Sequence, residues 1–214
     1  MMDVRSQVEA VERRTGSRTV DAGEAASVFL GQTYETSLRD LWDACTKAER
    51  LPEWFSPVNG ELRRNGRYEI EGNAAGTIQA CDPPNSFAAT WEFGGSESWI
   101  EVRFTAEGAE GSRITIEHIA MPDEHWDQFG PGAAGIGWDL AVMGLARYLD
   151  TGRPADPQAG EDWMQSAEGK RFMELSGQRW LEADVAAGTD PDAARARAER
   201  TIAFYTGAPG GMDR

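Results

Sequence analysis

The chain is short of positive charge. Its 214 residues include 21 Lys and Arg against 36 Asp and Glu, which gives a formal net charge of −15. Such a charge opposes binding to nucleic acid or to an anionic membrane surface, so neither partner is expected. Cysteine is scarce as well. Cys45 and Cys81 are the two present, and we expect reduced, buried thiols, with a disulfide between them as the alternative.

Targeting signals and long apolar runs are also missing. The first sixteen residues, MMDVRSQVEAVERRTG, have no apolar core of the kind found in a signal peptide. No apolar run approaches the roughly 18 residues that a membrane-spanning helix needs. These absences predict a cytoplasmic protein.

The familiar motifs of catalysis and cofactor binding are absent too. There is no G-x-S-x-G, and neither cysteine has a histidine near it in sequence. The glycines at 130–137 lack the lysine and the spacing of a phosphate loop. His118, Asp123, Glu124 and His125 match no known metal-ligand spacing. We therefore expect no metal and no cofactor.

What the chain does contain begins with a capped amphipathic helix. Ser37 followed by Asp40 resembles a capping box. The apolar residues that follow recur at helical spacing and form one stripe: Leu38, Leu41, Trp42 and Cys45. Residues 51–55, LPEWF, begin with a proline near the first position of a turn and predict a second short helix.

From Val58 onward the apolar period falls from 3.6 to 2, and turn residues recur at the short intervals typical of an antiparallel meander. Asn65-Gly66 is the strongest hairpin signal, because both positions of a type I′ turn need positive φ. Further turns are expected at 73–76, 83–85, 94–95 and 107–111. With an opening strand at about 28–35, the pattern predicts seven strands.

One long helix follows the meander, from about Gly132 to Asp150, with Gly152 and Pro154 as stop signals. Its apolar residues lie on two sides, so both sides should be covered. The predicted fold class is α+β. A curved, seven-stranded antiparallel sheet wraps around the long helix, with two short helices after the first strand and room for a ligand between sheet and helix.

Two segments flank this predicted domain of residues 27–152. Residues 1–26 form an N-terminal arm, with a short helix or partial disorder expected near Val4, Val8 and Val11. Residues 153–214 form a helical extension, whose last helix starts at Asp190-Pro191 and ends at Gly207. These helices are expected to pack on the domain. Forming a lid or joining a homodimer are the alternatives.

Strand parity predicts which residues face inward, because successive side chains of a strand alternate between its two faces. The resulting lining is aromatic and aliphatic, which is typical of small-molecule pockets and equally of an ordinary core. The predicted ligand-binding residues are Trp54, Phe55, Tyr68, Ile70, Trp91, Phe93, Val102, Ile116, His118, Trp126, Phe129 and Trp138.

His118 is the one titratable group on the predicted inner face, next to Ile116 by alternation. It is the candidate catalytic residue, as a general acid or base. The alternative is a core histidine that hydrogen-bonds to the backbone or to a carboxylate. His125, in the polar loop MPDEHWDQF, is expected to be exposed in a segment that closes the pocket mouth.

Four separated motifs occur in a familiar order: L-W-D-A-C-T-K-A-E-R-L-P-E-W-F, D-P-P-x-x-F-A-A-T-W-E-F, S-R-I-T-I-E-H and G-W-D-L-A-V-M-G-L. Over roughly residues 27–152 the chain resembles the START-like helix-grip superfamily (SRPBCC proteins), most of all the branch named after the activator of heat-shock protein 90 ATPase. The resemblance implies a helix-grip fold. It leaves three functions open, because a fold does not settle function. These are an apolar-ligand binding protein, a small cyclase- or hydrolase-type enzyme using His118, and a co-chaperone with a chaperone partner.

Overall fold

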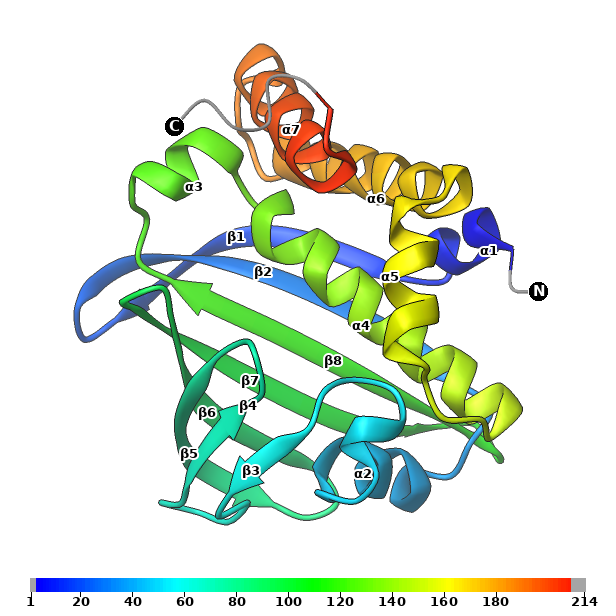
Figure 1. The fold of residues 1–214 in the computed structure, drawn as a ribbon. Coiled ribbons are helices and arrows are strands. Elements are labelled where there is room, and N and C mark those ends of the chain that lie inside the picture. The colour runs from blue at the N-terminus through cyan, green and yellow to red at the C-terminus, as the bar shows by residue number, and fades with distance from the viewer. Residues whose placement is uncertain (1–2, 209–214) are drawn as a thin grey trace. The chain divides into compact units, whose positions relative to one another are not determined.

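The structure, a computed structural model, describes residues 3–208 (Figure 1). Its helices are α1 (Val4–Glu9), α2 (Leu38–Thr46), α3 (Glu124–Phe129), α4 (Gly132–Thr151), α5 (Pro157–Gln165), α6 (Ala167–Ala186) and α7 (Pro191–Thr206), with a 3-10 turn η1 (Leu51–Glu53). Its strands are β1 (Glu12–Val20), β2 (Gly23–Tyr34), β3 (Val58–Gly60), β4 (Arg67–Ile70), β5 (Ala75–Asp82), β6 (Ser86–Phe93), β7 (Ser96–Glu107) and β8 (Gly111–Ala120).

The strands form one open sheet in the order β1-β2-β8-β7-β6-β5-β4-β3. The predicted α+β helix-grip class is confirmed. The described residues hold eight strands where the sequence predicted seven, because β1 adds a strand before the opening one. Strands β3 to β8 pair antiparallel with their neighbours, as a meander requires.

The described residues fall into two compact units. Residues 3–30, 121–140 and 156–208 form one, which we call the helical unit, and residues 31–120 and 141–155 form the other, the sheet unit. Both β2 and α4 run through the division, which falls after Leu30 and after Leu140. The domain boundaries drawn at 26 and 152 from the sequence stay a prediction.

Hairpin geometry in the sheet unit corrects one turn assignment. Gly94 and Gly95 both have positive φ, 59° and 84°, and join Phe93 to its partner Ser96 as a two-residue hairpin. At Asn65-Gly66 the type I′ prediction is wrong. Asn65 has a φ of 63° but Gly66 does not share it, and residues 61–66 form a longer loop between β3 and β4.

Helix α2 covers one part of the sheet unit. Ser37 caps it, accepting a hydrogen bond from the Asp40 amide as predicted. On the apolar side, the Trp42 ring lies edge-on to Phe104 at 5.3 Å and to Phe87 at 6.4 Å. These contacts anchor α2 on the face of β6 and β7 that carries the two phenylalanines.

The N-terminal segment corrects a second expectation. The short helix is present as α1, capped by Asp3, but the polar stretch after it forms strand β1 instead of a disordered arm. At the other end of the chain α7 confirms the sequence signals. Asp190 caps it, Pro191 opens it, and Gly207 ends it with a φ of 67°.

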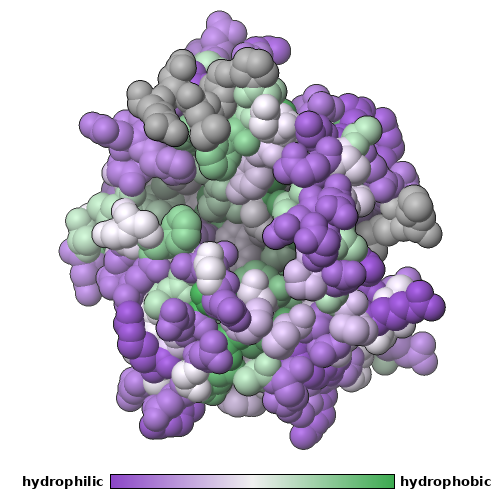
Figure 2. Space-filling model, in the orientation of Figure 1, coloured by the Kyte–Doolittle hydropathy of each residue, from purple (hydrophilic) through white to green (hydrophobic). Residues whose placement is uncertain are grey.

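The visible surface matches the composition. Figure 2 shows mostly hydrophilic residues on the face in view, with small apolar areas between them. Across residues 3–208, no helix combines the length and apolar character needed to cross a membrane.

Candidate functional site

The candidate site lies on one face of the sheet unit, and strand register defines it. Across β6, β7 and β8 the register places Ala89, Ile100 and His118 in one row. Antiparallel partners point to the same face, so the three side chains are neighbours. Ala89 and Ile100 are buried, as the sequence predicted for this face.

The exposure of this face changes along the strands. The row of Val102 and Ile116 is buried, each residue being 5% exposed or less. In the opposite direction, beyond Ile100, the face carries Trp91 paired with Ser98, and both are half-buried, as is His118. A sealed apolar core therefore gives way to an aromatic and polar patch. We call Trp91, Ser98 and His118 the histidine patch.

Short contacts hold the histidine patch together. The Ser98 Oγ lies 2.9 Å from His118 Nε2 and donates a hydrogen bond to the Trp91 carbonyl at 3.0 Å. The Trp91 and His118 ring centroids are 5.9 Å apart. Burial lowers the pKa of His118 to about 4, so the imidazole is neutral at pH 7.

This low pKa predicts a pH-dependent stability. The folded-state pKa lies below the ordinary value of about 6.5, so the stabilisation is complete above pH 6.5 and is lost as the pH falls toward 4. We expect the wild type to lose more unfolding free energy than His118→Gln between these pH values, by urea denaturation. His125→Gln is the control, and equal losses in wild type and His118→Gln would contradict the assignment.

Tyr68 and Ile70, on β4, are buried, with 6% and 4% of their surface exposed. The Tyr68 hydroxyl donates to the Thr90 carbonyl at 2.6 Å, and burial raises its pKa to about 12. Gly76 lets the tyrosine lie in this position, because a Cβ there would stand 2.0 Å from the Thr90 carbonyl oxygen and 2.9 Å from the tyrosine ring. Tyr68 and Ile70 thus belong to the packed core, and the Tyr68 hydroxyl reaches across β5 to β6.

Three other predicted site residues of the sheet unit lie apart from the buried face. The Trp54 indole donates to the Ala44 carbonyl at 2.9 Å and stacks obliquely on Phe55 at 5.5 Å, with both rings half-buried. Phe93 is 59% exposed beside the Gly94 turn, so its predicted inward placement is wrong. Phe93 keeps the alternation of Trp91, because its register partner is Ser96, but it lies at the hairpin end, where this face is exposed.

The last three predicted residues, Trp126, Phe129 and Trp138, belong to the helical unit. Trp126 and Phe129 lie on α3 and Trp138 on α4, and all three are half-buried. Phe129 packs between the exposed His125, at 4.7 Å, and Phe204, at 6.0 Å. The cavity predicted between sheet and long helix stays a prediction.

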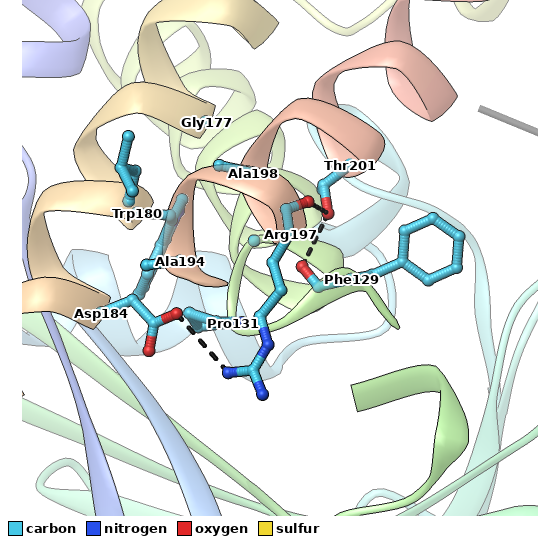
Figure 3. Close-up of a pocket in the computed structure, with 11 residues that line it drawn as sticks. Phe129, Pro131, Gly177, Trp180, Asp184, Ala194, Arg197, Ala198 and Thr201 are labelled. Carbon is cyan, nitrogen blue, oxygen red and sulfur yellow. Dashed lines mark hydrogen bonds and ion pairs between the residues drawn. The ribbon is translucent and has the colours of Figure 1, made fainter. Parts of the chain in front are cut away.

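A small pocket in the helical unit lies between α3, α6 and α7 (Figure 3). It is lined by Phe129, Pro131, Gly132, Gly177, Trp180, Leu181, Asp184, Ala194, Arg197, Ala198 and Thr201. It has room for about one water molecule. The Asp184 Oδ2 atom is buried without a hydrogen bond and lies 3.8 Å from Arg197 Nη1. This pocket is too small for an organic ligand.

A buried ion pair in the helical unit escaped the sequence analysis. Asp139 on α4 is fully buried and accepts two hydrogen bonds from Arg13 on β1, at 3.0 and 2.9 Å. It also accepts from Ser176 and from the Trp180 indole on α6. The one signal in the sequence is that Asp139 is the single charged residue of the first fifteen residues of α4, 132–146. Both carboxylate oxygens of Asp139 accept hydrogen bonds from side chains of the protein. The cluster therefore joins β1, α4 and α6 and leaves neither oxygen for a substrate.

Among residues 3–208 no group of three or more His, Cys, Asp or Glu side chains could hold a metal ion. A family model described as Activator of Hsp90 ATPase homolog 1-like protein matches residues 35–150. The chain belongs to this family. Comparison with curated proteins gives no match.

Solved structures of this fold include CalU16 from Micromonospora echinospora, which is 30% identical in sequence. Its crystal structure covers 81% of this chain and 98% of its own, with a TM-score of 0.67. Its solution structure covers 84% and 97%, with a TM-score of 0.72. PFC0360w, an HSP90 activator from Plasmodium falciparum, is 18% identical, covers 60% of this chain and 97% of its own, and has a TM-score of 0.50. That likeness is one of fold.

Proposed function

We propose that this family member binds an apolar or aromatic small molecule at the inner face of the sheet unit, with the histidine patch as the contact surface. The observation that carries the proposal is the change from a sealed core at Val102 and Ile116 to half-buried Trp91 and His118. A tryptophan and a neutral imidazole on one apolar face offer ring contact and a polar handle to the same ligand.

A neutral fluorescent dye tests this proposal on the full chain. N-phenyl-1-naphthylamine brightens in apolar surroundings, and we expect saturable binding to the wild type. Trp91→Ala should weaken binding about tenfold, because a lost aromatic contact costs about 1.4 kcal/mol. The measurement is a fluorescence titration at pH 7, with native mass spectrometry of the purified protein to detect any ligand that remains bound.

Trp99→Ala provides a matched control. Trp99 neighbours Ser98 on β7, is also half-buried, and points to the opposite face by strand alternation. Its loss should leave dye binding within about twofold of the wild type. A wild type that does not bind the dye, or equal weakening by both tryptophan variants, would refute the proposal.

A co-chaperone role is the second candidate, and the family match favours it. Its test is the ATPase rate of heat-shock protein 90 with and without the full chain. Stimulation that survives Trp91→Ala would assign the activity to another surface of the protein. An unchanged rate would remove this candidate and leave ligand binding untouched.

A further inference from the structure

The hydroxyl of Ser98 stands between two groups that both carry lone pairs. Its oxygen is 3.0 Å from the Trp91 carbonyl oxygen and 2.9 Å from His118 Nε2. A serine hydroxyl has one proton to donate, and a carbonyl oxygen has none. Two oxygens at 3.0 Å repel each other unless a proton lies between them, so the hydroxyl proton points to the Trp91 carbonyl.

The contact with His118 then has only one arrangement. Since the Ser98 proton is used on the carbonyl, the hydroxyl oxygen accepts, and His118 Nε2 must be the donor. The neutral ring carries a single proton, which is therefore on Nε2, and Nδ1 keeps a lone pair. In histidine rings the hydrogen bond made by one nitrogen commonly sets the state of the other.

We propose that Ser98 is the positioning residue of the histidine patch, and that its hydroxyl holds His118 as the Nε2–H tautomer with Nδ1 as a hydrogen-bond acceptor. Any group that hydrogen-bonds to Nδ1 must then bring a donor, as a hydroxyl or an N–H does. The tautomer itself needs no ligand, whereas its use in recognition rests on the proposed function.

The chain makes the test simple, because it has two histidines in all. His125→Gln leaves His118 as the only imidazole, and His125 lies in the other unit, outside the histidine patch. Long-range proton–nitrogen NMR of the full-length variant at pH 7 should show a protonated Nε2 and an unprotonated Nδ1. The Nε2 proton should exchange slowly with water because Ser98 accepts its hydrogen bond.

Free histidine also favours the Nε2–H form, so finding this tautomer in the parent does not by itself show that Ser98 holds it. Substitution of Ser98 is therefore the decisive part of the experiment. In the His125→Gln background, Ser98→Ala should speed exchange of the Nε2 proton at least tenfold, and Ser98→Thr, which keeps the hydroxyl, should restore slow exchange. A proton on Nδ1 in the parent, or unchanged exchange in Ser98→Ala, would overturn the proposal. If Ser98→Ala fails to fold, Ser98→Cys gives the same comparison, because a thiol is a weak hydrogen-bond acceptor and should also speed exchange. Dye binding is measured separately, so its failure is distinguishable from failure of this proposal.

Discussion

Replacing Asp139 by alanine should lower the free energy of unfolding by about 3–5 kcal/mol, because the change leaves a buried guanidinium without its counter-charge. The side chains of Arg13 and Asp139 are 4% and 0% exposed. Arg13 also donates to the Val8 and Val11 carbonyls, which hold it in place after the carboxylate is gone. The Trp180 indole loses its acceptor in the same step.

Urea unfolding followed by circular dichroism measures this loss. Arg63→Ala is the control, since Arg63 pairs with Glu61 at the surface, where the side chains are 69% and 62% exposed. Exposed pairs contribute about 1 kcal/mol or less. If Asp139→Ala lies within about 1 kcal/mol of the wild type, the ion pair does not hold the helical unit together.

A double variant separates the charge from the packing. Arg13→Met with Asp139→Leu removes both charges together, so no lone charge stays buried. We expect the double variant to be more stable than Asp139→Ala alone. That result would show that the unfolding free energy lost in Asp139→Ala comes mainly from the buried charge of Arg13 that no carboxylate balances.

Local signals predicted the parts of the fold that depend on nearby residues. The cap at Ser37, the helix start at Asp190-Pro191 and the helix end at Gly207 were predicted from the sequence and are present. Each of these depends on residues within one turn of the helix end. Strand parity likewise predicted the buried positions of Ile100 and Val102, because alternation is a property of the strand alone.

Features set by pairing between distant segments were missed. Strand β1 reads ERRTGSRTV, and its mostly exposed residues show no apolar alternation that would reveal a strand. It forms because β2 offers a neighbour, and that partner is not visible in a local window. Asn65-Gly66 failed for a similar reason. The loop backbone pairs with Ile78 of β5: the Asn65 amide donates a hydrogen bond to the Ile78 carbonyl, and the Ile78 amide donates one to the Gly66 carbonyl.

In the candidate site, too, local signals predicted some residues, and those that depend on distant segments were missed. His118 and Trp91 were predicted from alternation, whereas Ser98 was not, because its role depends on the register of β7 against β6 and β8. Asp139 was missed because its partners Arg13 and Ser176 lie 126 and 37 residues away in sequence. The alternation of residues along one strand predicts which face of the sheet a side chain lies on. Its hydrogen-bond partners depend on how distant segments pair, which a local pattern does not show.

Gly135→Ala should lower the free energy of unfolding by about 1–3 kcal/mol, although alanine favours a helix by up to about 1 kcal/mol over glycine. A Cβ at Gly135 would lie 2.2 Å from Trp180 Cε2 and 2.5 Å from its Nε1. The indole is rigid and 1% exposed, and its N–H is bonded to Asp139. It cannot move aside without breaking that hydrogen bond.

Gly160→Ala is a matched control, because Gly160 is the fourth residue of α5 as Gly135 is of α4. No heavy atom lies within 4 Å of the Cβ it would gain, so this variant should be more stable than the wild type by up to about 1 kcal/mol. Urea denaturation of the two variants gives effects of opposite sign if close packing of Trp180 on α4 decides the outcome. Stabilisation by both would mean that the indole has room to shift, and that the Asp139 cluster is looser than its hydrogen bonds indicate.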